Sequence, residues 1–294
     1  MLRRSLVTRF VLYGSFSVAI IACASTAPPK APPLASTPLP SSPPLRLAAA
    51  ATDESTPKAA TDSTSTSYAA ESSTSPEPAE APPNGCPTEM VLVEGSYCTE
   101  ARQTCAEWLD PPSLKVARCK EFAPAECVGP REKKRFCIDR DEYTKQGEAM
   151  PETDVSWTHA KESCEHQGKR LCYETEWELA CEGEQMLAYS IGNKRDSNKC
   201  NYDKTDLMDN RGKLRDYRKA SKDLDSCKSP YGVRNMTGNV DEWTFRDRTN
   251  GQWRSAMKGG WWMAARNRCR PATTAHDELY SGFQSGYRCC ANAK

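Results

Sequence analysis

Residues 235–243 read Asn235-Met236-Thr237-Gly238-Asn239-Val240-Asp241-Glu242-Trp243 and end in one of the chain's seven tryptophans. We expect Trp243, like Trp157 and Trp177, to lie in the core, because its ring removes a large apolar area from water while its N–H needs one acceptor. Gly238 and the pair Gly259-Gly260 are expected to take backbone shapes closed to other residues. The stretch therefore predicts a tight turn that leads into a buried segment.

Short regular elements are predicted on both sides of this turn. Apolar runs and alternation predict strands at residues 90–93, 135–139 and 286–290. A helix is predicted over 157–167, with Ser156 as its cap and Gly168 as its stop, and a second over 174–181. The second helix should bury one face, which carries Trp177, Ala180 and Cys181. Residues 99–135 are expected to form an irregular, cross-linked insertion, and residues 192–228 a long surface loop.

The charge balance excludes one class of function. The 294 residues hold 40 Lys and Arg against 39 Asp and Glu, a net charge of +1. Obligate polyanion binders normally show a clear basic excess, so no nucleic-acid partner is predicted.

The amino-acid composition changes at residue 84. Residues 24–84 hold 13 of the 21 prolines and 46 Ala, Pro, Ser or Thr among 61 positions. Such a tract predicts a disordered tether without folded structure.

The N-terminus predicts export. Three arginines precede an apolar stretch at residues 10–22, which at 13 residues is shorter than the roughly 20 that a membrane-spanning helix needs. The stretch ends in Ile20-Ile21-Ala22-Cys23, similar to a bacterial lipobox. We expect residues 1–22 to be a lipoprotein signal peptide, 23–84 a tether joined to the membrane through a lipid on Cys23, and 85–294 one folded domain. By analogy with lipoprotein sorting, Ala24 after the cysteine favours the outer membrane of the cell envelope.

The remaining cysteines predict disulfides. Fourteen of the 15 cysteines follow Cys23, an even number, and an exported protein meets an oxidising compartment. Structural zinc sites favour cysteine pairs two to four residues apart. Apart from the adjacent Cys289-Cys290, the cysteines here stand seven or more residues apart. Disulfide bonding is therefore favoured over zinc.

Several blocks of sequence follow one another in a fixed order over about residues 88–290. They are Met90–Gly95, Phe136–Thr144, Val155–Trp157 with Ala160 and Cys164, Gly168–Leu171 with Glu174, Glu176, Trp177 and Glu178, Tyr231–Val233, Met236–Trp243, Lys258–Trp262 and Gly286–Cys289. In this order they resemble the formylglycine-generating-enzyme, or sulfatase-modifying-factor, superfamily. The resemblance implies an α+β fold of the divergent C-type-lectin-like kind, disulfide-rich and with little regular secondary structure.

The resemblance also implies structural calcium. Matched by position, the ligands of one site would be Asn235, the carbonyls of Gly238 and Val240, and the Glu242 carboxylate; a second site would begin at Asn201 and the Tyr202 carbonyl. Hard oxygen donors brought together by a tight turn are what calcium requires. The alternative is that Asn235 and Glu242 only cap turns.

Enzymes of this superfamily oxidise a substrate cysteine with copper held by two thiolates, which suit copper(I). Counted from the paired glycines, the two positions are Ala264 and Cys269, and Trp261 replaces a serine. With one thiol missing, copper and oxidase activity are doubtful. Cys269 would be a catalytic thiol only in an oxidase, and the even cysteine count favours a disulfide instead.

The resemblance further implies a bond between Cys164 and Cys289. Cys290 should have a different partner, with Cys172, Cys181 and Cys269 as candidates.

A run of arginines follows the paired glycines, in a stretch that lines the substrate cleft in the superfamily. Arg266, Arg268 and Arg270 stand at alternate positions, where guanidinium groups could face an anion or carboxylate. The alternative is a structural network in which they pair with acidic side chains or carbonyls. His276, Trp261 and Trp262 are further cleft candidates, with the tryptophans as aromatic walls or as filling for a lost active site.

We therefore expect a non-catalytic binding or structural module of the cell envelope, anchored to the membrane through Cys23. Its ligand would be an unidentified protein, peptide or small molecule. The alternative is a copper-dependent oxidase, or a related redox enzyme, that acts on exported substrates.

Overall fold

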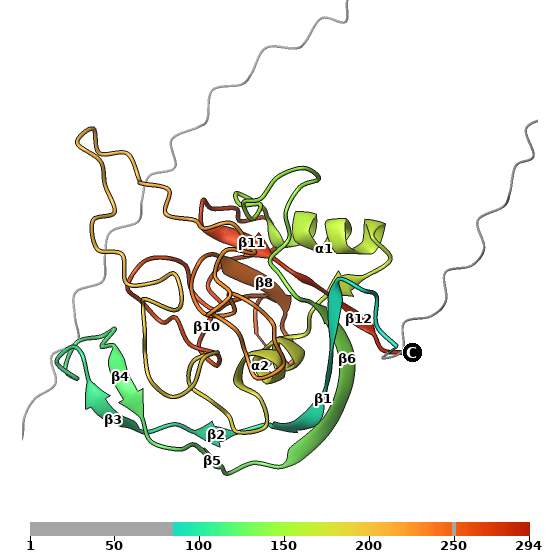
Figure 1. The fold of residues 1–294 in the computed structure, drawn as a ribbon, viewed down its shortest axis with the longest axis horizontal. Helices are drawn as coiled ribbons and strands as arrows, with labels where there is room; N and C mark the ends of the chain where they lie inside the picture. The colour runs from blue at the N-terminus through green and yellow to red at the C-terminus, as the bar shows by residue number, and fades with distance from the viewer. Residues whose placement is uncertain (1–84, 249–250) are drawn as a thin grey trace, which may run out of the picture. The chain divides into compact units, whose positions relative to one another are not determined.

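The computed structural model describes residues 85–248 and 251–294 (Figure 1). The predicted signal peptide and the whole predicted tether, including Cys23, lie outside the described residues. No helix within the described ranges is both long and apolar enough to cross a membrane.

The first sheet is built on a long antiparallel pair, β1 (Met90–Cys98) and β6 (Arg131–Asp139), in which Met90 faces Asp139 and Cys98 faces Arg131. β12 (Cys289–Asn292) and β7 (Arg170–Leu171) complete the order β1-β6-β12-β7. Both predicted strands, at 90–93 and 135–139, exist but are longer than expected. The first half of β6 is solvent-exposed and charged, so its sequence shows no apolar alternation.

The second sheet has the order β10-β9-β8-β11, with strands β8 (Asp241–Phe245), β9 (Ser255–Lys258), β10 (Ala272–Thr273) and β11 (Ser285–Tyr287). β11 runs parallel to β8, and the other pairs are antiparallel. The single strand predicted at 286–290 is therefore wrong. The chain leaves one sheet at Tyr287 and enters the other at Cys289, with the buried Arg288 between them.

Two helices cover the sheets. α1 (Trp157–His166) begins where the Ser156 hydroxyl accepts the His159 N–H at 3.1 Å, as predicted, and Gly168 follows its end with a positive φ of 68°. α2 (Glu174–Glu182) differs from its prediction, because all nine residues are buried rather than one face.

The acidic side chains of α2 are neutralised by cations from distant elements. The Lys258 ammonium lies 2.6 Å from Glu178 and 3.5 Å from Glu174, and we call these three residues the buried ionic cluster.

The predicted core tryptophans are confirmed, and each indole N–H has an acceptor. Trp157 donates to the Thr244 carbonyl at 3.0 Å, Trp177 to the Glu242 carboxylate at 2.7 Å and Trp243 to the Val155 carbonyl at 2.8 Å. Trp177 packs in the cluster between α2 and the first sheet, whereas Trp157 and Trp243 pack between α1 and the second sheet. The three tryptophans thus belong to two separate apolar clusters, the second of which also includes Leu171 and Cys289 of the first sheet.

The insertion is more regular than predicted. β1 and β6 remain paired to Cys98 and Arg131, so the inserted segment is residues 99–130, which we call the arm. It contains four short strands, β2 (Ala101–Arg102) paired with β5 (Glu126–Cys127), and β3 (Cys105–Trp108) paired with β4 (Cys119–Phe122). Figure 1 shows the arm extending the β1–β6 pair away from the C-terminus.

The fourteen cysteines from Cys86 onward form seven disulfides. The Cys164–Cys289 bond implied by the resemblance is present, and Cys290 bonds to Cys172. Residues 192–228 hold no helix or strand, but Cys200, Tyr202 and Cys227 are buried there and Cys200 bonds to Cys227. The expectation of a surface loop is wrong for this part, since the disulfide carries it into the interior.

Candidate functional site

The turn at residues 235–241 takes the strained form that its sequence predicts. Asn235 and Asn239 have positive φ angles of 58° and 63°, and Gly238 has 94°. A Cβ atom on Gly238 would lie 2.5 Å from the Asn201 carbonyl oxygen, so a side chain cannot fit there. The Asn201 amide also donates to the Asn239 side-chain oxygen at 2.9 Å. The two segments implied as calcium sites, 201–202 and 235–242, are therefore packed against each other.

Glu242 leaves this turn with both carboxylate oxygens engaged. The Arg288 guanidinium donates to them from Nε and Nη2, each at 2.6 Å, and the Trp177 indole donates to Oε2 at 2.7 Å. Arg288 and Glu242 are at most 1% exposed. A buried, two-pronged ion pair of this kind holds β8 to the end of β11.

A second buried carboxyl, Glu142, lies beside the turn. Its Oε2 accepts from the side-chain amides of Asn235 at 3.1 Å and Asn239 at 2.7 Å, whereas Oε1 has no hydrogen-bond partner. The side-chain oxygens of Asn235 and Asn201 and the Ser221 hydroxyl are also buried without partners. Burial raises the pKa of Glu142 to about 8, and the nearby Glu242 charge adds to the shift. Buried polar atoms are nearly always paired, so these oxygens mark a place for a further donor, water or cation.

These unpartnered oxygens can be compared with the calcium ligands that the resemblance implies. Asn235 and Asn201 fit, because each has an unpartnered, buried oxygen. Glu242 fits poorly, because Arg288 and Trp177 already occupy its oxygens. Within the described ranges no three His, Cys, Asp or Glu side chains form a metal-binding group, so a site here would depend on amide and carbonyl oxygens. Sequence reasoning missed Glu142, since nothing in its spacing connects it to residue 235.

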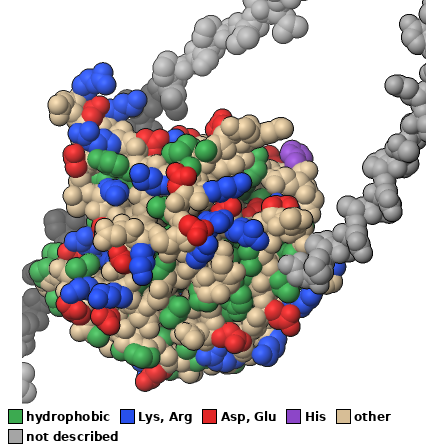
Figure 2. All heavy atoms as spheres, viewed as in Figure 1, with side chains coloured by type: hydrophobic (Ala, Val, Ile, Leu, Met, Phe, Trp, Pro, Cys, Tyr) green, Lys and Arg blue, Asp and Glu red, His purple; other side chains and the backbone are tan. Residues whose placement is uncertain are grey.

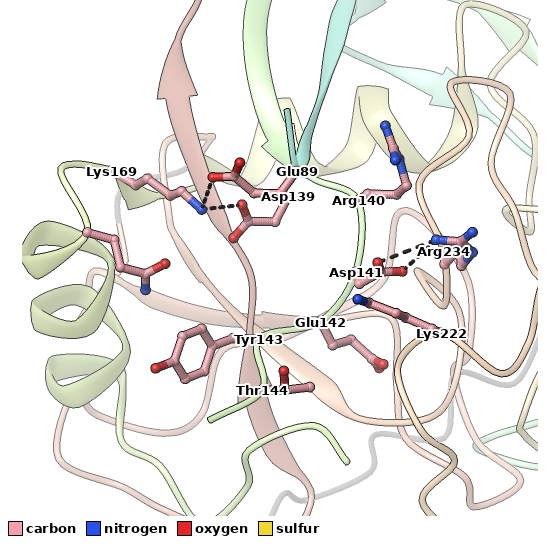
Figure 3. A pocket seen from close by; sticks show the side chains of 11 residues that line it. Glu89, Asp139, Arg140, Asp141, Glu142, Tyr143, Thr144, Lys169, Lys222 and Arg234 are labelled. Carbon is pink, nitrogen blue, oxygen red and sulfur yellow. Dashed lines mark hydrogen bonds and ion pairs between the residues drawn. The ribbon is translucent and has the colours of Figure 1, made fainter. Parts of the chain in front are cut away.

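A polar pocket of about 480 Å³ opens on the outer side of Glu142 (Figure 3). Lys169 binds Asp139 at 2.7 Å and Glu89 at 3.2 Å, and Arg234 binds Asp141 at 3.0 Å. Its lining is Glu89, Asp139, Arg140, Asp141, Glu142, Tyr143, Thr144, Gln167, Lys169, Lys222 and Arg234. The lining is dominated by charged side chains of both signs, several of which are paired with one another.

Cys269 is a disulfide partner. Its sulfur is bonded to Cys181 of α2, and the residue is fully buried. The other counted position is Ala264, which has no metal-ligating atom. Copper(I) sites of the implied kind require two thiolates, and this segment supplies none. The donor set therefore does not fit copper.

The three arginines do not form one ligand-binding face. Arg266 donates to Asp241 at 2.8 Å, and Arg270 forms a fork with Glu182 at 2.8 and 2.6 Å. Arg268 lies over the Phe122 ring, 5.1 Å from its centroid. Arg266 and Arg270 thus serve the structural network that was the alternative expectation, because buried carboxylates of other elements lie within reach.

The aromatic cleft candidates lie in two places. Trp261 and Trp262 form a cluster with Phe283, in which Trp261 is 5.0 Å from each of the other two ring centroids. His276 is separate and stacks on Tyr280 at 3.7 Å. Trp262 and Phe283 also line a cleft of about 220 Å³, together with Thr153, Asp154, Lys213, Leu214, Asp216 and Arg218. A cleft therefore remains beside the tryptophans, with charged groups at its rim.

Comparison with known proteins assigns the family. The model of the sulfatase-modifying factor enzyme 1-like domain matches residues 83–293. A Bos taurus protein, inactive C-alpha-formylglycine-generating enzyme 2, is 29% identical over 160 residues, which are 49% of this chain and 51% of that protein. The chain thus spans about half the length of this curated relative.

Solved structures to which the chain shows similarity include PvdO from Pseudomonas aeruginosa and Treponema denticola variable protein 1. The first is 16% identical with a TM-score of 0.47, and the second is 14% identical with a TM-score of 0.45. Each comparison covers 69% of this chain and 94% of the other.

The chain belongs to the family of sulfatase-modifying factor enzyme 1-like domains. The predicted fold class is confirmed, a divergent C-type-lectin-like α+β fold with two helices, short strands and seven disulfides in the described residues. Disulfide-rich domains of this kind are typical of extracytoplasmic proteins.

Proposed function

We propose that this chain is an exported, lipid-anchored domain of the cell envelope that acts as a non-catalytic binding or structural module. The observation that carries the proposal is the bond between Cys181 and Cys269. It removes the thiolate that an oxidase would need, and Ala264 leaves no second one. The similarity to a relative named as inactive supports the same conclusion.

Thiol titration of the purified chain in denaturant tests this proposal. We expect no reactive thiol before reduction, apart from Cys23 if it is unmodified, and fourteen more afterwards. Incubation with copper, oxygen and a cysteine-containing peptide should produce no aldehyde. A free Cys269 together with aldehyde formation would establish the oxidase instead.

The anchor is tested separately. Cys23→Ser should move the chain produced in a Gram-negative host from the detergent phase to the aqueous phase, because a thiol is required for lipidation. Density fractionation of the unsubstituted chain should place it with the outer membrane. Unchanged detergent partitioning of Cys23→Ser would exclude the lipid anchor.

A ligand would enter the cleft beside Trp262 and Phe283. An aromatic floor with Lys213, Asp216 and Arg218 around it suits a small molecule or peptide side chain with both apolar and polar groups. Trp262→Ala should then abolish binding of any ligand found by screening, whereas His276→Ala, on the separate Tyr280 stack, should not.

Calcium is part of the proposal as a structural ion. Its ligands would be the side-chain oxygens of Asn235 and Asn201, with the carbonyls of Gly238, Val240 and Tyr202 in the same segments. Glu142, rather than Glu242, would supply the negative charge, because Glu142 Oε1 is unpartnered. Several oxygen donors around one carboxylate satisfy calcium's preference.

Thermal unfolding with calcium and with a chelator tests this ion. At a calcium concentration about 100 times Kd, binding contributes about 2.7 kcal/mol, which corresponds to about 5–11 °C in Tm for a domain of this size. Glu142→Gln should abolish the calcium-dependent shift. Glu242→Gln is the matched control, which should lower Tm by breaking the Arg288 pair but keep the shift. An unchanged melting curve in chelator would exclude the site.

A further inference from the structure

The tip of the β3–β4 hairpin exposes a group of large apolar side chains. Trp108, Leu109, Leu114 and Val116 are 45%, 46%, 54% and 57% exposed. They lie within nine residues, 108–116, which we call the hairpin tip. The other exposed large apolar residues of the described ranges are scattered over the fold, at Val128, Tyr173, Met208, Leu279 and Phe283. Figure 2 shows apolar side chains at the edge of the molecule where Figure 1 places β3 and β4.

The hairpin tip is held firmly in this position. Cys105 and Cys119 are bonded across its base. Just beyond it, the Arg118 guanidinium forks onto Asp110 of the tip at 2.7 and 2.8 Å and also reaches Asp203 at 3.2 Å. The cross-linked base and the Arg118–Asp110 pair restrict the loop. Exposed apolar groups gathered on one surface point to an interaction.

The size of the hairpin tip separates the possible partners. A stable protein interface uses about 20–30 residues a side, and four side chains on one narrow loop supply only a small part of that. The same size requirement argues against a contact between the hairpin tips of two copies of this chain. A lipid surface needs no complementary shape, and tryptophan favours the boundary between water and hydrocarbon. Lys115, which forms no ion pair in the described structure, lies between Leu114 and Val116, where it would face lipid headgroups.

We propose that the hairpin tip inserts into the surface of a lipid bilayer and so orients the domain on it. This inference rests on the proposed function in one respect, because the proposed lipid anchor would keep the domain close to a bilayer. Insertion of four partly exposed side chains gives weak binding alone, but attachment to the same membrane makes it an intramolecular event with a high effective concentration.

Vesicles of phosphatidylethanolamine and phosphatidylglycerol test the proposal with the mature chain lacking its lipid, residues 24–294. Brominated lipids should quench part of the tryptophan fluorescence, and Trp108→Phe should remove that part. Leu114→Ser with Val116→Ser should weaken partitioning about tenfold or more, since each side chain loses apolar burial. Met208→Ser and Leu279→Ser are matched controls on other exposed apolar residues, and they should leave partitioning unchanged. Near-UV circular dichroism checks that every variant is folded.

Two results would overturn the proposal. One is partitioning that the tip substitutions do not change, and the other is absence of partitioning at every lipid concentration reached. If the same substitutions instead abolish self-association in sedimentation velocity, the hairpin tip is a contact between copies and the lipid proposal is wrong. Because these vesicles test an unlipidated chain, the result does not depend on Cys23, and the anchor and the insertion can fail independently.

Discussion

The interior around α2 and the arm are stabilised in opposite ways. α2 is buried on all sides, and its acidic residues are matched by cations from other elements, as in the buried ionic cluster of Glu174, Glu178 and Lys258. The arm buries few side chains, and two disulfides, Cys98–Cys127 and Cys105–Cys119, close its strands. Two of its ion pairs, Arg102–Glu126 and Glu107–Lys120, lie at the surface, whereas Arg118–Asp110 is partly buried.

This contrast shows what each part can tolerate. A buried charge without its partner is strongly unfavourable, so the interior depends on every member of its network. A surface pair is screened by water and contributes little. Short strands with a small core need cross-links instead, which lower the entropy of the unfolded chain. Loss of one partner should therefore reduce the stability of this protein most in the ion pairs that are least exposed.

The largest expected effect comes from the buried ionic cluster. Lys258→Met should lower the free energy of unfolding by about 3–5 kcal/mol, because it leaves Glu178 buried without its closest cation. Lys120→Met, which breaks the exposed pair with Glu107, is the matched control in the arm and should change stability little. Urea unfolding measures both. Equal losses in the two variants would contradict the contrast.

The next largest effect comes from the disulfides. Loss of Cys105–Cys119, with both residues changed to Ala, should reduce stability by about 3 kcal/mol for its 14-residue separation. The loss should be confined to the arm. Hydrogen exchange should therefore accelerate at residues 99–130 while α2 remains protected. The double Ala variant of Cys181 and Cys269 should instead expose α2 and the whole domain. Matching exchange patterns would show that the arm is not an independent unit.

The pH dependence of stability should differ in sign between buried Glu142 and Asp110 of the arm. Burial raises the pKa of Glu142 to about 8, so in calcium-free buffer its stabilising contribution is complete below about pH 4.5 and is lost as the pH rises to 8. Hydrogen bonds from Arg118 hold the pKa of Asp110 at about 2, so its contribution is present above about pH 4 and lost as the pH falls through 2.

Urea unfolding of Glu142→Gln across this range should give a flatter pH profile than the unsubstituted chain. Asp110→Asn should alter exchange of the arm only at neutral pH, where the native carboxylate is ionised. A Glu142→Gln profile that still falls between pH 5 and 8 would show that another group causes the dependence.

The sequence by itself determined the family, the fold class and the burial of Trp157, Trp177 and Trp243. It also showed that Ala264 stands at one of the two copper-binding positions, and the even cysteine count favoured a disulfide for Cys269, which the structure contains. These properties are local or follow from residue order. A tryptophan ring is buried wherever its turn lies in the fold, because it is large and apolar. Folding cannot give Ala264 a thiol.

Only the tertiary structure decided which charges meet. Residues 142 and 235 are far apart in the chain, yet their side chains bond, and Arg288 reaches Glu242 from another strand. The arginine run was ambiguous in the sequence, because a guanidinium can face a ligand or a buried carboxylate equally well. The all-round burial of α2 and the regular arm were unpredictable for the same reason. Each depends on distant partners, and electrostatic pairing depends on distance in space rather than on separation along the chain.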